Sequence, residues 1–378
     1  MPIFMDRHDI SDSITAEDVA QLHQKDLKVQ GQFGCRGITY WFDDKRKTAF
    51  CLIEAPNADA IRKMHDEAHG DVPYSVIEVD PGVVEVFLGR ISDPEKAADT
   101  ELNIIDDPAF RTIMVISIDP HSLTDTASFS FQTGFANVQE SFAETLRKYE
   151  GNIVKNTDYH YLVSFKSVSN AVHAAINIQK RFQKFADEHK QKEAELKIGL
   201  NAGVPVTSTQ LIFEDTIKLA ERMCRLVNAQ VVLSSEVKEL FGNENTSKIL
   251  DGKGVYCLSK SDENFVTELM NYADESWSDT NFRVDGFTKL LGTSKSQLYR
   301  KMISITGKSP NAFIMDFRLK EAMKMLIKNA GNVSEVAFAT GFSSPSYFSK
   351  CFQKRYGQIP SDFLPSQTRQ NVRSGATN

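Results

Sequence analysis

Apolar and polar residues in the first 80 positions alternate with the period of a strand in some stretches and with that of a helix in others. In order, the pattern predicts a strand at 2–7, a helix at 15–29, strands at 37–42 and 48–54, a helix at 59–68 and a strand at 74–79. This strand–helix–strand–strand–helix–strand order predicts a ferredoxin-like layout, in which both helices lie on a single face of one sheet.

Strand and helix patterns also alternate in the middle of the chain. Residues 80–109 are polar and acidic and predict a short helix and a linker, the linker lying at 89–109. The pattern then predicts a strand at 110–119, a helix at 135–149, a hairpin at 152–165, a helix at 169–189, a strand at 195–206, a helix at 215–227 and a strand at 230–237. We expect a second α/β sandwich here.

The C-terminal part contains the same pattern twice, at 284–307 and 332–357, joined by a helical run at 309–329. Each copy has a short helix, a turn with a glycine (Gly292 or Gly341) and a second helix. Glycine suits such turns because a left-handed backbone costs least without a Cβ. Ser294 and Ser344 stand where the second helices need an N-cap.

Each second helix has an apolar face and a polar face. Leu298, Met302 and Ile305 follow helical spacing in the first copy, and Phe348 and Phe352 do so in the second, so we expect these faces to be buried. The opposite faces carry Ser, Gln, Arg and Lys. A helix that buries aromatic and aliphatic residues and exposes such polar ones has the form of a major-groove reader.

The residues of this region resemble the AraC/XylS family of bacterial transcription regulators. The resemblance rests on LYRKM, TGKSPNAFI, RLKEA, EVAFATGF, SPSYFSKCF and YGQIPSDF, which cover about the last quarter of the chain. It implies an AraC-type DNA-binding domain at 263–366, followed by a flexible tail at 367–378. Double-stranded DNA is then the expected partner.

The distribution of charge agrees with a DNA-binding C-terminal part. Residues 281–378 contain 15 Lys and Arg against 5 Asp and Glu, a formal charge of +10. Because the whole chain carries −6, residues 1–280 must carry −16. The overall acidity therefore hides a basic domain, which is the charge expected of a protein region that contacts phosphates.

Exposure, length and polarity select the side chains that we expect to contact DNA. Near the start of the first reader helix, Ser296, Gln297 and Arg300 can reach base edges. Lys301, Arg318 and Lys354 lie further round and are expected to touch phosphates. The remaining predicted contacts are Ser294, Ser344, Ser346 and Lys350.

Residues 110–258 resemble the class III nucleotide cyclase domain, through IDPHSLTD, GNIVK, LKIGLNAGVPV, DTIKLAERM and NAQVVLSSEVKEL in the family's order. The resemblance implies that Asp119 stands at the first metal-binding Asp and Lys155 at a base-recognition Lys, with Arg222 at the Arg of an Asn–Arg pair. The second Asp is replaced by Tyr159, and the Asn by Lys218.

Catalysis by this domain is not expected, because two metal ions are needed to activate the 3′-hydroxyl and neutralise the triphosphate. Asp158 is one residue away from the missing position and therefore points to the other face of its strand. Two roles stay open: nucleotide binding through Asp119, Lys155 and Arg222, or a scaffold without a ligand. In either case the domain would support a homodimer, since cyclase domains work as head-to-tail pairs.

The N-terminal stretch resembles a small bacterial ferredoxin-like family described as nickel-binding, through FMDRHD, ITAEDVAQLH, TYWFDDKRKTAFCLIEAP and MHDEAHG. Asp6 and His8 share one face of a predicted strand, and His65 and His69 share one face of a predicted helix. These four residues are candidate ligands for a divalent transition metal such as nickel, although zinc or copper would suit them too. A purely structural or dimerising module is the alternative.

Taken together, the sequence predicts an α+β protein: two α/β sandwich domains, ferredoxin-like at 1–88 and cyclase-like at 110–260, precede an all-α tandem helix-turn-helix domain. No apolar run is long enough to cross a bilayer, and five scattered cysteines without a CxxC pair suit a reducing cytoplasm. We expect a cytoplasmic, non-enzymatic transcription regulator with a metal or nucleotide effector. The rival hypotheses are an active purine nucleotide cyclase with a DNA-binding tail and a metal-responsive or metal-buffering protein tethered to DNA.

Overall fold

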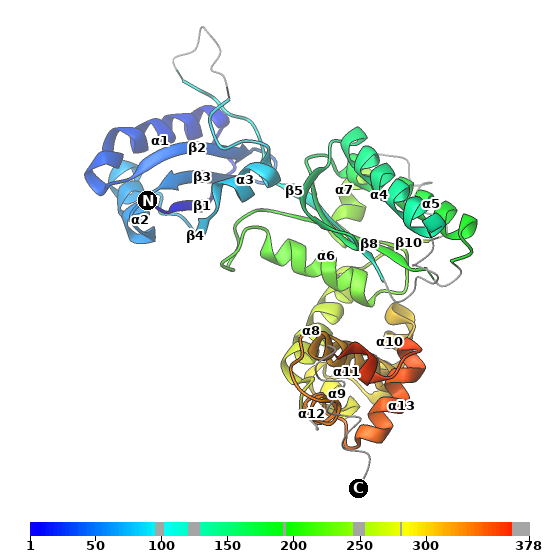
Figure 1. Cartoon of the computed structure of the whole chain (residues 1–378). Helices are drawn as coiled ribbons and strands as arrows, with labels where there is room; N and C mark the ends of the chain where they lie inside the picture. The colour runs from blue at the N-terminus through cyan, green and yellow to red at the C-terminus, as the bar shows by residue number, and fades with distance from the viewer. Residues whose placement is uncertain (95–101, 120–128, 192–193, 245–253, 280–281, 365–378) are drawn as a thin grey trace. The chain divides into compact units, whose positions relative to one another are not determined.

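The computed structural model describes residues 1–94, 102–119, 129–191, 194–244, 254–279 and 282–364 (Figure 1). Contacts divide the chain into two compact units. The N-terminal unit contains residues 1–225 and 229–259, and the helical unit contains residues 226–228 and 260–378. Among the described residues, no helix combines the length and the apolar character needed to cross a membrane.

The first sheet of the N-terminal unit is antiparallel, in the order β2-β3-β1-β4. Its strands are β1 (Ile3–Asp9), β2 (Arg36–Asp43), β3 (Thr48–Glu54) and β4 (Ser75–Val79). Helices α1 (Ala16–Val29) and α2 (Ala58–His69) pack on one face, and the short helix η1 (Gln30–Phe33) follows α1. The predicted ferredoxin-like order is confirmed.

The other face of the first sheet is apolar, with Met5, Trp41 and Leu52 fully buried. These side chains belong to a core cluster that also contains Phe87 of helix α3 (Pro81–Leu88) and Phe213 of the later sequence. Segments more than 100 residues apart therefore share one core. The two sheets of the N-terminal unit are joined by packing as well as by the chain.

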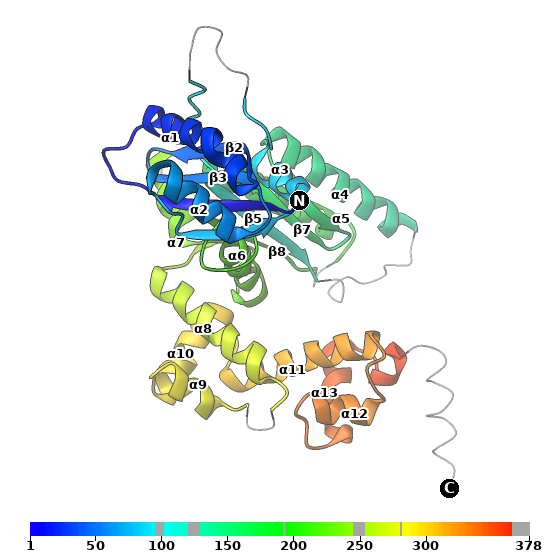
Figure 2. The same ribbon diagram turned by 90° about the vertical axis from the view of Figure 1, so that its left-hand side faces the viewer.

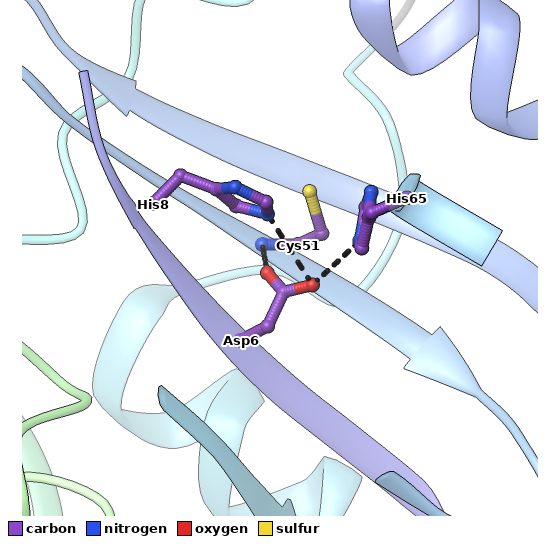
Figure 3. Close-up of side chains that lie close together, drawn as sticks. All are labelled: Asp6, His8, Cys51 and His65. Atoms are coloured by element: carbon purple, nitrogen blue, oxygen red, sulfur yellow. Dashed lines mark hydrogen bonds and ion pairs between the residues drawn. The ribbon is translucent and has the colours of Figure 1, made fainter. Parts of the chain in front are cut away.

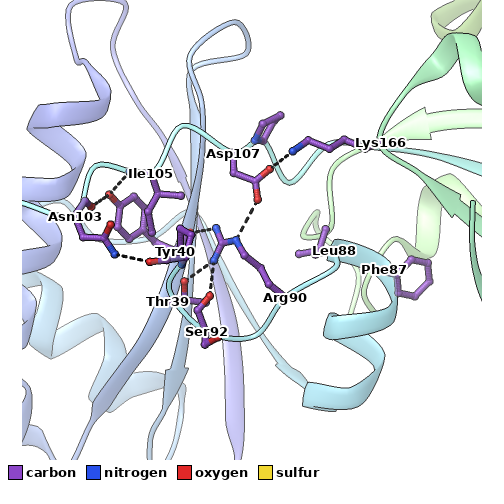
Figure 4. Close-up of polar contacts among 12 residues, drawn as sticks. Thr39, Tyr40, Phe87, Leu88, Arg90, Ser92, Asn103, Ile105, Asp107 and Lys166 are labelled. Atoms are coloured by element: carbon purple, nitrogen blue, oxygen red, sulfur yellow. Dashed lines mark hydrogen bonds and ion pairs between the residues drawn. The ribbon is translucent and has the colours of Figure 1, made fainter. Parts of the chain in front are cut away.

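The stretch predicted as a linker carries a hydrogen-bond network (Figure 4). Arg90 donates to the Asp107 carboxylate at 3.1 Å, and its terminal nitrogens reach Thr39 Oγ1 and the Tyr40 carbonyl, each at 2.6 Å. Asp107 also accepts from Lys166 Nζ at 2.6 Å. The stretch therefore forms hydrogen bonds with residues that precede it and with one that follows it in the sequence. Within the stretch, the Ile105 side chain is 2 % exposed.

Arg111 closes the end of α3. The side chain is 3 % exposed, and it donates to the carbonyl oxygens of Phe87 at 3.1 Å and Leu88 at 2.8 Å. It also donates to those of Pro108 at 2.7 Å and Phe110 at 2.9 Å. The last carbonyls of a helix have no partner within the helix, so this buried guanidinium supplies donors that water cannot.

The second sheet has six strands in the order β10-β9-β8-β5-β7-β6. They are β5 (Arg111–Ile118), β6 (Asn152–Thr157), β7 (His160–Phe165), β8 (Leu196–Gly203), β9 (Val231–Leu233) and β10 (Val255–Cys257). The helices of this part are α4 (Phe129–Lys148), α5 (Val168–Glu188), α6 (Glu214–Leu226) and α7 (Ser235–Glu244).

The central strand β5 pairs antiparallel with both β7 and β8, and its side chains enter a core that contains Phe142, Ile178 and Phe241. Helix α6 approaches β8 closely at Gly199, where a Cβ would lie 2.3 Å from the Ala220 carbonyl oxygen. Only glycine fits this contact. The predicted strands and helices are present, although α4 begins at Phe129, six residues before its expected start. The last strand, expected at 230–237, ends at Leu233, and helix α7 begins at Ser235.

The helical unit contains α8 (Lys260–Ser276), α9 (Val284–Leu290), α10 (Lys295–Thr306), α11 (Pro310–Ile327), α12 (Val333–Ala339), α13 (Pro345–Tyr356) and the short η4 (Pro360–Phe363). The pairs α9–α10 and α12–α13 form the two predicted helix-turn-helix copies, and α11 runs between them (Figure 2). Gly292 (φ 59°) and Gly341 (φ 79°) are left-handed, as their turns require.

Asp316 on α11 holds the second copy to the start of α11. Its carboxylate lies 2.8 Å from Lys308 Nζ, 3.4 Å from Lys320 Nζ and 3.1 Å from Arg355 Nε of α13. Burial raises the pKa of Asp316, but Lys320 and Lys308 outweigh burial and hold the pKa well below its usual range. The carboxylate is therefore charged, and it lies among three cationic side chains.

Arg318, two positions after Asp316 on α11, contacts the segment before the first copy and the turn of the second copy. Its guanidinium donates to the carbonyl oxygens of Asp279 at 2.9 Å and Phe282 at 3.4 Å, just before the first copy. The same group packs against Gly341 in the turn of the second copy, where a Cβ would lie 2.7 Å from the guanidinium. Helix α11 thus fixes both copies through Asp316 and Arg318.

We predict that Arg111→Ala destabilises the N-terminal unit by about 3 kcal/mol, because it leaves buried carbonyl oxygens without donors and removes packing. Trp41 is fully buried in this unit, and the chain's other tryptophan is Trp277. Urea unfolding of the full chain, followed by Trp41 fluorescence in a Trp277→Phe background, measures the loss. Arg36→Ala is the control, since Arg36 pairs with Glu54 at the surface; an equal loss in both variants would contradict the prediction.

Asp316→Asn should destabilise the helical unit by about 1–3 kcal/mol at pH 7, since it leaves three cations without their carboxylate. The pKa of Asp316 is depressed in the folded chain, so the stabilisation is complete above the pKa of about 3.9 of an unfolded Asp and is lost as the pH falls through the folded value.

The difference between wild type and Asp316→Asn is therefore expected to stay constant from pH 7 to 5 and to shrink below about pH 4. Urea unfolding followed by Trp277 fluorescence, taken as the difference from the Trp277→Phe chain, measures it. Asp285→Asn serves as the control because Asp285 is 72 % exposed in its pair with Lys295. A difference that grows toward acid pH would refute the assignment.

Candidate functional site

The first reader helix, α10, has the two faces that its sequence predicts. Leu298, Met302 and Ile305 are at most 2 % exposed, and Ser296 and Arg300 lie on the exposed side. Capping explains why the helix starts where it does: Ser294 Oγ accepts from the Gln297 backbone nitrogen at 3.2 Å. Ser296 and Arg300 are thus presented on a helix whose other face is fixed in the core.

Gln297 is part of the cap rather than only part of the exposed face. Its side-chain oxygen accepts from the Ser294 backbone nitrogen at 2.9 Å, which completes a capping box. An amide that reads adenine uses both its oxygen and its nitrogen. The oxygen of Gln297 is therefore engaged in the cap of α10.

The lysines of α10 are paired within the helical unit. Lys301 forms an ion pair with Asp262 of α8, and Lys295 lies 2.6 Å from Asp285 of α9. Lys301 is also only partly exposed. Arg318 also donates to backbone carbonyls, so two of the three predicted phosphate ligands make contacts within the helical unit. Lys354 is exposed on α13 and retains its predicted place.

The second reader helix, α13, repeats the arrangement. Ser344 Oγ accepts from the Tyr347 backbone nitrogen at 3.4 Å, and Pro345 occupies the first turn. Phe348 and Phe352 are fully buried. Ser346, Lys350 and Lys354 are exposed on the other side. The two helices therefore present similar polar faces.

The three candidate nucleotide-binding residues lie on or beside three different elements, β5, β6 and α6. Asp119 follows β5, where its backbone nitrogen donates to the Glu195 carbonyl at 3.1 Å, and it borders residues 120–128, which lie outside the described part. Lys155 is exposed on β6, and Arg222 is partly buried on α6.

Tyr159 and Lys218, which the resemblance to cyclases aligns with catalytic positions, make different contacts. Tyr159 is 36 % exposed, and its ring lies 5.7 Å from that of Phe135. Lys218 forms an ion pair with Glu214 on the same helix. Neither side chain supplies the carboxylate or the amide that the cyclase reaction uses.

A cluster of potential metal ligands lies between the first sheet and α2 (Figure 3). Asp6 and His8 come from β1, Cys51 from β3 and His65 from α2. One carboxylate oxygen of Asp6 lies 2.9 Å from His65 Nε2 and 3.6 Å from His8 Nε2. The other oxygen accepts from the Cys51 backbone nitrogen at 2.8 Å. All four side chains are buried.

Two further carboxylates lie behind the histidines. Asp26 of α1 lies 3.0 Å from His65 Nδ1 and 3.1 Å from His69 Nε2. Asp71 lies 3.5 Å from His8 Nδ1. Of the four predicted ligands, the structure therefore brings Asp6, His8 and His65 into one group, whereas His69 belongs to a second group with Asp26 and His65.

Charges within the cluster shift its pKa values. Burial lowers the pKa of His8, but Asp6 and Asp71 outweigh burial and raise it to about 10. Burial also lowers the pKa of His65, and the carboxylates of Asp26 and Asp6 raise it to about 9. Burial and nearby carboxylates together raise the pKa of the Cys51 thiol well above its usual value. These shifts favour the charged forms of His8 and His65 and the neutral thiol of Cys51.

Sequence reasoning missed Cys51, Asp26 and Asp71. Cys51 lies opposite Asp6 because β1 and β3 pair with Met5 beside Leu52. That register follows from long-range pairing, which no local pattern in the sequence reveals. Asp26 lies on the buried face of α1. Helical periodicity could have placed it on this face, and a buried carboxylate is uncommon enough to mark a candidate site.

Comparisons with known proteins identify both ends of the chain. Residues 287–366 match a family described as helix-turn-helix domain, and residues 4–79 match a family described as nickel responsive protein SCO4226-like. The predicted resemblances at the two ends are confirmed.

Individual proteins match parts of the chain. Histidine kinase P4 of Formosa agariphila is 36 % identical over 106 residues, which are 28 % of this chain and 8 % of that protein. The HTH-type transcriptional regulator MtrA of Neisseria gonorrhoeae is 29 % identical over 98 residues, 26 % of this chain and 31 % of that protein. The chain thus spans less than a third of either relative.

Among solved structures, the adenylyl cyclase CyaB of P. aeruginosa is 17 % identical, covering 35 % of this chain and 81 % of that one, with a TM-score of 0.29. The matches to the two families lie at the ends of the chain, outside the second sheet. The chain carries an AraC-type helix-turn-helix domain at its C-terminus and an SCO4226-like domain at its N-terminus.

Proposed function

We propose that this protein is a sequence-specific DNA-binding transcription regulator of the AraC type, acting in the cytoplasm on double-stranded DNA. The observation that carries the proposal is the pair of capped reader helices, α10 and α13, whose apolar faces are buried and whose polar faces are exposed. The formal charge of +10 at 281–378 supports it, because phosphate neutralisation supplies much of the affinity for a duplex.

The two reader helices are expected to enter successive major-groove turns, about 34 Å apart along one face of the duplex. This requires that the two copies keep a fixed relation to each other. Asp316 and Arg318 on α11 supply such a constraint, since each contacts groups from more than one segment. We therefore assign Arg318 and Lys301 to positioning within the domain.

Base reading falls to the exposed polar side chains. On α10 these are Ser296 and Arg300, of which arginine favours the O6 and N7 edge of guanine. On α13 they are Ser346 and Lys350, where serine discriminates less. Lys354 touches a phosphate, which positions the protein without reading sequence.

The middle of the chain serves as a non-catalytic module in this proposal. Tyr159 and Lys218 stand where the resemblance to cyclases calls for Asp and Asn. Nucleotide binding through Asp119, Lys155 and Arg222 and a scaffold role are both compatible with this, as is a homodimer. A homodimer would present two helix-turn-helix pairs to DNA together.

A transition metal is the second candidate signal, and a specific observation favours it. Both ring nitrogens of His8 are buried without a hydrogen-bond partner among the described residues. A buried polar atom left in this way needs an explanation, and an ion is one. The family at 4–79 is described as nickel responsive, which agrees with a metal signal for this regulator.

Two substitutions separate base reading from phosphate contact. Arg300→Ala should relax the preference at one or two base pairs, with a loss of about 1–3 kcal/mol of discrimination. Lys354→Ala should weaken binding to all sequences alike and reduce the salt slope by about one unit. Fluorescence anisotropy with a sequence selected from a random DNA pool, and with its point variants, measures both.

Lys324→Ala is the matched control for these substitutions, because Lys324 is an exposed lysine on α11 outside the predicted faces. It should leave affinity and preference unchanged. If Arg300→Ala lowers affinity uniformly for all sequences, the assignment of this face of α10 to base readout is wrong.

We also predict that the full chain makes no cyclic nucleotide from ATP or GTP above background with Mg²⁺ or Mn²⁺. The reason is that the second carboxylate needed for two-metal catalysis is replaced by Tyr159. Chromatographic detection of cyclic products checks it. Turnover that disappears in Asp119→Ala would establish the rival hypothesis of an active cyclase.

A further inference from the structure

A groove of about 600 Å³ lies in the helical unit, between the two helix-turn-helix copies. Its lining comes from the residues around the start of α9, the start of α10, the first half of α11 and the first turn of α13. Sites for small organic molecules typically have volumes of about 300–1,000 Å³. The groove therefore has the size of a site for an organic molecule, and a single inorganic anion would fill only a small part of it.

Two guanidinium groups border the groove, and neither forms an ion pair with a residue in the described part of the chain. Arg283 is exposed, whereas Arg318 is partly buried and donates to backbone carbonyl oxygens. Burial lowers the pKa of Arg318, the positive charge of Arg283 lowers it further, and Asp279 acts in the opposite direction. An anion beside both guanidinium groups would relieve their repulsion.

The lining also contains one carboxylate, that of Asp285, which lies 2.6 Å from Lys295 Nζ. This ion pair occupies the carboxylate with a third cation of the lining. The two arginines therefore remain available for an anion that comes from outside the chain.

The rest of the groove is mostly apolar. Phe282 and Ile314 are 1 % and 7 % exposed, and Met315 of α11 is partly exposed. The ring of Tyr347 is 52 % exposed and offers a flat apolar surface with a polar tip. Asn311 adds an amide that can both donate and accept a hydrogen bond. Cations thus lie beside apolar and aromatic surface, which suits a molecule with an anionic group and an apolar body.

We propose that this groove binds a small organic anion. Its carboxylate or phosphate group lies at Arg283 and Arg318, and its aromatic or apolar body lies against Met315 and Tyr347. Arginine suits such groups because its planar fork donates two parallel hydrogen bonds to them. The site is separate from the metal and nucleotide signals considered above, since it lies within the helical unit.

The position of the groove connects its ligand with DNA binding. Lys295 and Tyr347 border the groove, and each is the neighbour in sequence of a residue assigned to base reading, Ser296 or Ser346. A molecule beside both reading faces excludes part of the DNA, and its negative charge repels the nearby phosphates. The anion and DNA therefore compete, and each weakens the other by the same factor. Binding of the anion is independent of the proposed function, whereas this competition rests on it.

A phosphate of the DNA backbone is the other source of an anion for this groove. A strand that passes between the two reader helices would bring phosphates toward Arg283 and Lys295. A backbone phosphate alone would leave the apolar surface of Met315 and Tyr347 uncovered. The apolar surface therefore favours a free organic molecule, and the two sources give different results in the experiment.

The experiment titrates the full chain with anilinonaphthalene sulfonate, a fluorescent aromatic anion. Energy transfer from Trp277 of the helical unit to the bound probe, taken as the difference from the Trp277→Phe chain, reports binding in this unit. We expect saturation at one equivalent per chain. Arg283→Ala and Tyr347→Ala should each weaken binding about 10-fold, because each removes a contact of the ligand. Lys324→Ala is the control and should bind as the wild type does, since Lys324 lies outside the groove.

Both substituted side chains are exposed, so their loss should leave the fold intact, and circular dichroism verifies this. Arg318 is left unchanged because it contacts both copies. The proposal is overturned if the wild-type chain shows no saturable energy transfer, or if Arg283→Ala binds the probe as tightly as Lys324→Ala. A groove that takes only DNA phosphates would give the first of these results together with a lower affinity of Arg283→Ala for DNA.

Fluorescence anisotropy with DNA separates the effect of the anion from the proposed function. Without the probe, the wild-type chain tests DNA binding alone. With the probe, the wild type should lose affinity for DNA, and Arg283→Ala should lose much less. Probe binding that DNA does not weaken would refute the competition, whereas a chain that binds the probe but no DNA would refute only the proposed function.

Discussion

The alternation of side chains along β1 is the constraint on which the N-terminal unit depends. Phe4, Asp6 and His8 point toward α1 and α2, whereas Met5 and Arg7 point to the opposite face. On that face Met5 enters the core shared with the second sheet, and Arg7 donates to the Val206 carbonyl at 3.2 Å. A shift of one residue would exchange the faces and place carboxylates in the shared core.

The same strand therefore joins the ligand cluster to the packing between the two sheets. Asp6 and His8 each have a neighbour in the chain that is anchored on the other side, so a change in their ligation acts on a strand held at both faces. The Arg90 network and Arg111 add polar contacts to this junction, with donors placed on backbone carbonyls such as those of Tyr40 and Phe87. An isolated first sheet would expose Met5, Trp41 and Leu52 to water.

Local sequence patterns were sufficient to predict most of the fold but only part of the candidate sites. The caps at Ser294 and Ser344 and the left-handed glycines were predictable because each depends on a few neighbouring residues. The engagement of Arg318 was not, because its partners lie about 20–40 positions away in the chain and polar exposure alone suggested a phosphate ligand. Cys51 was missed for the same reason, since only the strand register places it opposite Asp6.

The 15 Lys and Arg residues of 281–378 are not all available to contact DNA. Lys295 and Lys301 are neutralised by Asp285 and Asp262, and three more cations surround Asp316. Those carboxylates hold the reader helices in position by pairing with cations that could otherwise contact phosphates. The field at the DNA face then depends on the exposed Arg300, Lys350 and Lys354, so the salt dependence of binding should reflect far fewer phosphate contacts than the 15 Lys and Arg residues of 281–378 could make. Positioning and attraction compete for the same side chains, and this domain uses many of its lysines for positioning.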